Sequence, residues 1–289
     1  MRYPGPEDAE AKAEHWLKQN GIASLPVDPF EIAKSLEIEV RPKEDAEPGV
    51  SGMLLRHREA FGILYATHIH SMGFQRFSVG HELGHYLLEG HADLLFPDGD
   101  GVHSSRAGFT SDVLHEREAD HFACGLLMPD GPFKSALRRC GEGLEAIEQL
   151  ADKCLTSITA TAIRYARKTS VPAAVVVSTD GRVDFAFLSG EMREFSELTT
   201  LRKGELVPDN SPTAMFARSK DNVLRARREA GEVDLRSWLG GRRSVEATEE
   251  VLGLGSYGRV LTVLTTDFLA DDEDEEGDLE EKWTPRFRR

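Results

Sequence analysis

The segment Phe77–His91, FSVGHELGHYLLEGH, constrains the fold of this chain more than any other stretch. At about 100° per residue, His81, Glu82 and His85 fall on one face of a helix, and most of the apolar residues fall on another. Two imidazoles one turn apart can reach a single ion, with Glu82 beside its open coordination position. The segment therefore predicts a helix that packs on a core with one face and holds a metal with the other. The competing interpretation is a chance HExxH on an ordinary amphipathic helix.

The HExxH arrangement is typical of zinc hydrolases. Zinc lowers the pKa of a bound water to about 7 and polarises a scissile carbonyl, and Glu82 would take up the proton and return it to the leaving amine. All ten histidines lie between His15 and His121, so a histidine-based site is confined to the first half of the chain.

A third ligand is expected on the helix predicted over 112–127. Its apolar arc includes Glu116, and a carboxylate that faces a core must be paired or bound to a metal, because burying it bare costs several kcal/mol. Asp120, one turn later, can accept a hydrogen bond from the far nitrogen of a ligand histidine. On the same wheel, Glu118 and His121 face outward.

Two alternative ligands remain open. Glu118 replaces Glu116 if the phase of the helical wheel slips. His91 stands six residues after His85, the spacing of the third histidine in HExxHxxGxxH enzymes. That geometry needs glycine at position 88, where this chain has leucine, and Gly90 comes too late.

These motifs carry a family resemblance. The stretches RFSVGHELGHYLLEGH, EREADHFACGLLMP and PVDPFEIAKSLEIEV resemble the ImmA/IrrE family of cytoplasmic zinc peptidases over about residues 8–135. The resemblance implies a Zn²⁺ cofactor, a thermolysin-like (gluzincin-type) site with Glu116 as third ligand, and a narrowly specific regulatory metalloendopeptidase. Several members cleave a helix-turn-helix transcriptional repressor, which relieves repression in a stress response or a mobile element.

The expected fold class is α+β. Short apolar runs at 38–40, 51–55 and 61–65 predict a small antiparallel sheet packed on the HExxH helix, whose exposed edge could pair with an extended peptide. A long loop is expected from 92 to 112. The zinc peptidase domain would span 1–137, and a helix-turn-helix-like helical segment 138–170.

After Pro172 the pattern changes to strands, with a hairpin around Thr179–Arg182 and a further strand at 260–265. Helical segments are expected near 211–229 and 244–251. Residues 171–270 would form a smaller α+β domain with a sensor or regulatory role, for which the resemblance suggests a GAF-like fold. The acidic tail 271–289 is expected to be disordered.

Charge and composition limit the partners. The net charge is −15, and residues 271–281 contribute nine of the negative charges. The mildly acidic remainder argues against a wide nucleic-acid footprint, so direct DNA binding is the less favoured option for the helical segment. No apolar run approaches the roughly 20 residues of a membrane span, and the N-terminus does not have the pattern of a signal peptide. A cytoplasmic location without membrane contact is expected.

Three functions remain in view. The first is a zinc endopeptidase acting on one protein substrate, with a helix-turn-helix repressor as the expected target. The second is a metal-containing sensor or binding protein that sequesters a regulator or contacts DNA without proteolysis. The third is a zinc hydrolase of a small amide. A mere binder has no use for Glu82, which favours the enzymes.

Overall fold

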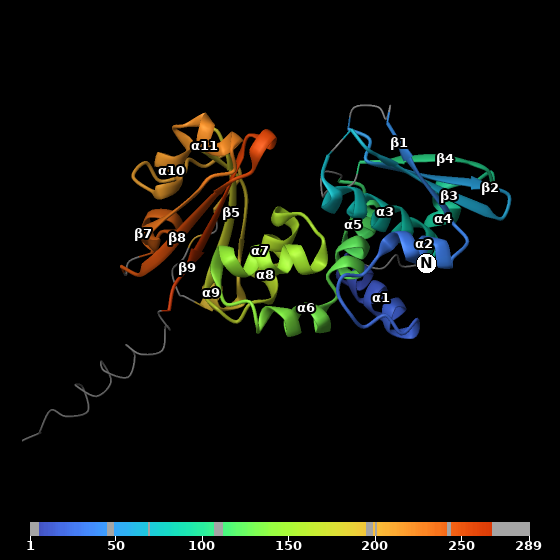
Figure 1. Cartoon of the computed structure of the whole chain (residues 1–289), viewed down its shortest axis with the longest axis horizontal. Coiled ribbons are helices and arrows are strands. Elements are labelled where there is room, and N and C mark those ends of the chain that lie inside the picture. Colours follow the sequence, from blue (N-terminus) through green and yellow to red (C-terminus); the bar gives the residue numbers. More distant parts are fainter. Residues whose placement is uncertain are drawn as a thin grey trace, which may run out of the picture. The chain divides into compact units, whose positions relative to one another are not determined.

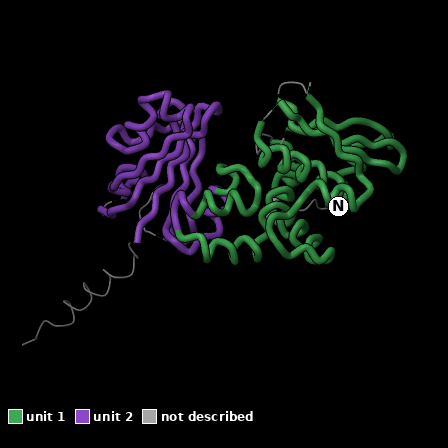
Figure 2. The backbone as a smooth tube through the Cα atoms, in the orientation of Figure 1, with its two compact units in different colours: residues 1–141, 146–161 green, residues 142–145, 162–289 purple. Residues whose placement is uncertain are grey.

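The computed structural model describes residues 6–44, 49–68, 70–106, 112–194, 199, 201–241 and 244–267. The fold is mixed α+β, as predicted (Figure 1). The chain divides into two compact units, one of residues 1–141 with 146–161 and one of 142–145 with 162–289 (Figure 2). The bounds of the four predicted segments stay predictions, and the tail 271–289 lies outside the described residues. Within the described part, no helix is long and apolar enough to cross a membrane.

The first unit combines helices with one small sheet. Its elements in chain order are α1 (Pro6–Gln19), α2 (Pro29–Ser35), β1 (Glu39–Lys43), β2 (Gly52–His57), β3 (Ala60–Ala66), α3 (Met72–Leu87), α4 (His91–Leu95), β4 (Gly101–Ser105), α5 (Leu114–Leu127) and α6 (Asp130–Leu137). Helices α7 (Gly143–Cys154) and α8 (Ile158–Lys168) follow, and the division between the units falls within both.

The sheet of this unit has the strand order β1-β3-β2-β4. β2 pairs antiparallel with β3 and with β4, whereas β1 pairs parallel with β3. The prediction of an antiparallel sheet is therefore wrong at the β1 edge. β2 lies between β3 and β4, so β1 pairs with the other side of β3. β1 and β3 both run opposite to β2, and they are therefore parallel to each other.

The predicted loop over 92–112 is also wrong in part, because it contains the end of α4 and the whole of β4. The β4 sequence, GVHSS, lacks an apolar alternation. It is a strand because its backbone pairs with β2 from Gly52↔Ser105 to Arg56↔Gly101, a tertiary contact that a local pattern does not reveal.

Helix α3 forms the centre of the unit. The Ser71 side chain caps it by accepting a hydrogen bond from the Phe74 amide at 3.3 Å. All residues from Arg76 to His85 are buried, and the helix packs on β2, β3 and α5. It ends because Leu88 is extended and Gly90 has a φ of 84°, a left-handed turn that starts α4 at His91.

Helix α5 is covered on two sides, by α3 and by α1. This arrangement corrects the helical wheel, which placed Glu118 and His121 outward. Glu118 is 0% exposed and His121 is 9% exposed, and the His121 imidazole pairs with Glu10 of α1 at 2.9 Å. A wheel read from one sequence assumes one buried face, and α5 has two.

The second unit is built on a five-stranded antiparallel sheet with the order β6-β5-β9-β8-β7. Its further elements are β5 (Ala173–Thr179), β6 (Arg182–Leu188), α9 (Gly190–Glu194), α10 (Pro212–Ala217), α11 (Lys220–Leu224), β7 (Arg228–Asp234), α12 (Leu235–Leu239), β8 (Glu246–Gly253), a 3-10 turn η1 (Gly255–Tyr257) and β9 (Arg259–Thr265). The β5–β6 hairpin is confirmed, with left-handed Asp180 and Gly181 at its turn.

The helix predicted over 244–251 is wrong, because this stretch belongs largely to β8. Glu249 hides the alternation of that strand. It is fully buried, and its carboxylate accepts hydrogen bonds from the Thr213 amide and from Trp238 Nε1, both at 2.7 Å. An inward glutamate satisfied in this way reads as polar in the sequence but occupies a core position. The helix predicted over 211–229 is likewise shorter, since β7 begins at Arg228.

We predict that Gly125→Ala destabilises the first unit. A Cβ on Gly125 would lie 2.7 Å from the Glu10 carbonyl oxygen and 2.9 Å from its Cα, so α1 and α5 would have to separate. Overpacking of this kind costs about 1–3 kcal/mol.

Gly80→Ala is the matched control, because the nearest atom to its Cβ is the Ala123 Cβ at 3.4 Å. Thermal unfolding followed by circular dichroism should show a lower midpoint for Gly125→Ala only, and equal midpoints would contradict the close α1–α5 contact.

Candidate metal site

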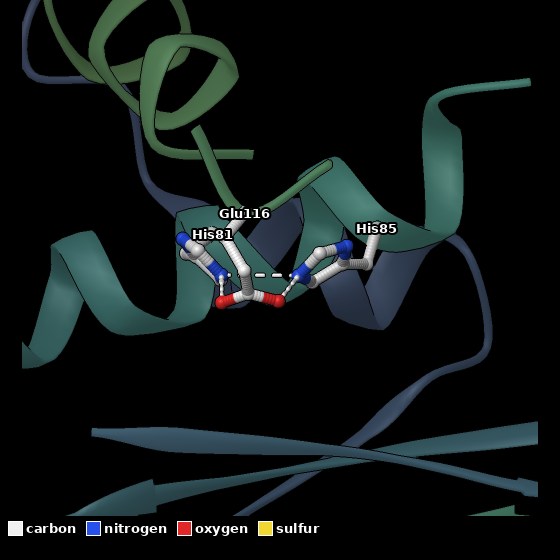
Figure 3. Close-up of side chains that lie close together, drawn as sticks. All are labelled: His81, His85 and Glu116. Atoms are coloured by element: carbon white, nitrogen blue, oxygen red, sulfur yellow. Dashed lines mark hydrogen bonds and ion pairs between the residues drawn. The ribbon is translucent and has the colours of Figure 1, made fainter. Parts of the chain in front are cut away.

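Three side chains converge on one point of the first unit (Figure 3). His81 and His85 project from α3 and Glu116 projects from α5. The two Nε2 atoms are 3.1 Å apart, and the Glu116 carboxylate oxygens lie 3.5 Å from His81 Nε2 and 3.3 Å from His85 Nε2. All three residues are buried, and one ligand atom from each lies within 4.8 Å of the others.

The positions of these residues follow from two simple features. His81 and His85 are one helical turn apart, so both rings leave the same face of α3. Glu116 lies in the first turn of α5, which packs directly against α3. The contact between these two helices therefore sets the distance between the carboxylate and the imidazoles.

Asp120 lies one turn after Glu116 and contacts the far side of His81. Its Oδ1 is 2.8 Å from His81 Nδ1, and both side chains are almost fully buried. This contact leaves Nε2 of His81 directed toward Glu116. The geometry is that of an imidazole held by a carboxylate behind it, with its other nitrogen available to an ion.

The charges of the cluster reinforce one another. Burial lowers the pKa of His81, but hydrogen bonds to Asp120 and Glu116 outweigh it and raise that pKa to about 10. Burial likewise raises the pKa of Glu116, yet contacts with His103, His81 and His85 bring it well below its usual range. Burial lowers the pKa of His85 to about 3, which leaves its ring neutral and able to act as a ligand. The Glu116 carboxylate attracts positive charge to the point where the three side chains meet, and a metal ion bound there would replace the second proton of His81.

Glu82 lies beside His81 and is fully buried. Among the described residues, neither of its carboxylate oxygens has a hydrogen-bond partner of standard geometry. Burial raises its pKa to about 7, and the neighbouring His81 and Ser105 counteract part of that increase. Space for this carboxylate depends on Gly52 of β2, since a Cβ there would lie 2.6 Å from Glu82 Oε1. A carboxyl group of this kind can exchange protons near neutral pH.

The two alternative ligands lie outside the three-residue cluster. His91 Nδ1 is 3.2 Å from His85 Nδ1, the nitrogen opposite the one that faces Glu116. Glu118 Oε2 is 3.1 Å from His91 Nε2. The turn at Gly90 thus brings His91 back toward His85, but to the far side of its ring.

Two further histidines at this site were missed by the sequence analysis. His103 of β4 has its Nε2 2.9 Å from Glu116 Oε1, and His115 Nε2 is 3.5 Å from the same oxygen. The only available signal was the confinement of all histidines to the first half of the chain. His103 could not be placed without β4, and His115 precedes the apolar part of its helix.

The donor set fits a metal. Two imidazole nitrogens and one carboxylate, with their ligand atoms within 4.8 Å of one another, are donors that a divalent metal accepts.

Comparisons with known proteins point to the same region. Residues 33–165, which contain α3 and α5, match the family model described as the IrrE N-terminal-like domain of the M78 peptidases. The radiation response metalloprotease IrrE of Deinococcus radiodurans is 29% identical over 108 residues, which cover 37% of this chain and 32% of that protein. Its counterpart from Deinococcus deserti is 28% identical over 150 residues, covering 49% of this chain and 52% of that protein. The matched segments therefore span about a third and about half of these relatives.

A solved structure shares the fold. A Mycobacterium tuberculosis transcriptional regulator superposes with a TM-score of 0.56 at 14% identity, over 90% of this chain and 76% of that one. At this identity the likeness concerns the fold alone. The family model and the two relatives confirm the resemblance read from the motifs: residues 33–165 are similar to the IrrE N-terminal-like domain of the ImmA/IrrE family.

Proposed function

We propose that the chain is a zinc-dependent regulatory endopeptidase with His81, His85 and Glu116 as metal ligands. The observation that carries the proposal is the spacing of the ligand atoms, at 3.1, 3.3 and 3.5 Å. A tetrahedral zinc with bonds of about 2.0–2.1 Å holds its ligands about 3.3 Å apart. Imidazole nitrogen and carboxylate oxygen are also donors that zinc accepts readily.

Glu82 is the proposed general base. When bound, zinc supplies Lewis acidity that polarises a carbonyl and makes a water acidic near neutral pH. The Glu82 carboxylate would accept a proton from the attacking water and donate it to the leaving amine. Its burial supports this role, as does the absence of a hydrogen bond of standard geometry to its oxygens among the described residues, because a weakly paired carboxylate is a strong acceptor. Asp120 would keep His81 in the tautomer that presents Nε2 to the metal.

The sheet edge at β4 is the proposed place for an extended substrate. Among the described strands, β4 pairs with β2 alone, and His103 of β4 contacts Glu116. A peptide added along the free side of β4 would gain backbone hydrogen bonds and run beside the ligand set. This arrangement favours a peptide substrate over a small amide.

The biological role is proposed from the family. Two relatives are named as radiation response metalloproteases, and the resemblance in the motifs implies cleavage of a helix-turn-helix repressor in a stress response. We propose the same class of substrate here, a cytoplasmic location, and a sensor role for the second unit, with a GAF-like fold. The competing proposal is a metal-containing binding protein that sequesters a regulator without cutting it.

A substrate trap separates these two proposals. Glu82→Gln, immobilised, should capture a DNA-binding protein from a lysate of the source cells. Wild type should then cut the purified captured protein at a defined bond, and a chelator should stop the cleavage. A partner that binds stoichiometrically but stays intact with zinc-loaded wild type would support the binding protein instead.

We predict that Glu82→Gln lowers the cleavage rate by about 10²–10⁴-fold, the usual contribution of a general base. The amide cannot accept the proton, whereas the three ligands are unchanged, so the zinc content should equal that of wild type. Rates on the captured protein and metal analysis of the same preparations test both points. Cleavage at the wild-type rate would rule out Glu82 as the base.

We predict that Gly52→Ala lowers the cleavage rate by on the order of 100-fold, the effect of a displacement of about 1 Å in a reacting group. The new methyl would occupy the space of Glu82 Oε1 and move the carboxylate without touching the ligands. Gly62→Ala on the adjacent β3 is the matched control, because the nearest atom to its Cβ is the Glu39 carbonyl oxygen at 3.6 Å. Full activity in Gly52→Ala, with zinc bound, would contradict the proposed position of Glu82.

A further inference from the structure

A series of buried polar contacts starts at the ring of His85, separate from the His81–Asp120 contact. His85 Nδ1 lies 3.2 Å from His91 Nδ1, and His91 Nε2 lies 3.1 Å from Glu118 Oε2. All three residues are 0% exposed. Glu118 Oε1 has no hydrogen-bond partner among the described residues, so the contact of Oε2 with His91 is what orients this carboxylate.

The proton positions along this series are interdependent. Two Nδ1 atoms face each other across 3.2 Å, so one must donate and the other must accept. A metal on Nε2 of His85 requires the proton of that ring to be on Nδ1. His91 must then accept at Nδ1 and carry its own proton on Nε2, where it donates to Glu118.

The helix geometry explains why an imidazole is needed here. Glu116 and Asp120 are four residues apart on α5 and leave the same face, toward α3. Glu118 lies between them in sequence and points about 200° away from Glu116, so it cannot reach His85 directly. His91, at the start of α4, fills the gap between the ring and the carboxylate.

We propose that His91 and Glu118 are positioning residues that hold His85 in its metal-binding tautomer, as Asp120 does for His81. This inference rests on the proposed metal site, but it assigns a role to two residues that the sequence analysis treated only as alternative ligands. The carboxylates of Asp120 and Glu118 differ in how they reach their ligand histidine. Asp120 contacts its imidazole directly, whereas Glu118 acts through a second ring.

The test is the zinc affinity of purified apoprotein, measured by competition with a chromophoric chelator. His91→Phe keeps an aromatic ring of similar shape but removes both nitrogens. We expect its affinity to fall about 10–100-fold, the usual effect of removing the partner of a ligand histidine. Glu118→Gln is nearly isosteric and keeps a neutral acceptor, so its loss should lie near the lower end of that range, about tenfold.

The variant that combines His91→Phe and Glu118→Gln shows whether the two residues act on His85 in series or independently. Because Glu118 acts only through His91, the variant with both changes should bind zinc as weakly as His91→Phe alone. Losses that multiply would mean that the residues act independently and would overturn the proposal. If His91→Phe does not fold, as judged by circular dichroism of the apoprotein, the Glu118→Gln affinity decides: a value equal to wild type overturns the proposal.

Two reference variants complete the design. Glu10→Gln and His121→Phe disrupt another His–Glu pair, part-buried and at 2.9 Å, that joins α1 to α5. They should leave the zinc affinity unchanged. His85→Phe removes a proposed ligand, and an equally large loss in His91→Phe would identify His91 as a ligand and overturn the positioning role. If wild type does not bind zinc, the proposed metal site is wrong. If wild type and His91→Phe bind zinc equally tightly, only the positioning role of His91 and Glu118 is wrong.

Discussion

The packing of α5 against α3 is the constraint on which the rest of the first unit depends. One turn of α3 places two imidazoles on one face, but only the neighbouring helix can bring a carboxylate within 3.5 Å of both. That helix is itself pressed from the other side by α1, with backbone contacts close enough that Gly125 has no room for a side chain. The spacing of the proposed ligands is therefore a property of three packed helices rather than of a flexible loop.

The site concentrates ionisable groups where a protein normally buries apolar ones. His81, Glu82, His85, Glu118 and Asp120 are each at most 1% exposed. Burying such groups costs free energy unless each is paired with a partner, and most of these groups have a buried partner. Asp120 contacts His81, and Glu118 reaches His85 through His91. Glu82 differs, since neither of its oxygens has a hydrogen bond of standard geometry among the described residues, and it lies where the proposed chemistry needs a proton acceptor.

The spacing of residues within one helix predicted most of the side-chain positions that depend on that helix alone. The spacing of His81 and His85 and the apolar arc around Glu116 indicated which side chains meet, and Asp120, predicted to contact one of these histidines, lies 2.8 Å from His81. The failures concern features set by distant segments. Burial of Glu118 and His121 required α1 on the second face of α5. His103 required β4, which is a strand only because it pairs with β2, and Glu249 made β8 look helical although its carboxylate is satisfied inside a core.

The most direct test of the account is X-ray absorption at the zinc edge on the purified full-length protein. We expect about one zinc per chain with nitrogen and oxygen ligands at about 2.0–2.1 Å, including the outer scattering of two imidazoles. Replacement of Glu116 by alanine should leave the two imidazoles and lose an oxygen ligand. Sulfur ligands at about 2.3 Å, or a spectrum with no imidazole scattering, would place the metal elsewhere and contradict the assignment of His81, His85 and Glu116.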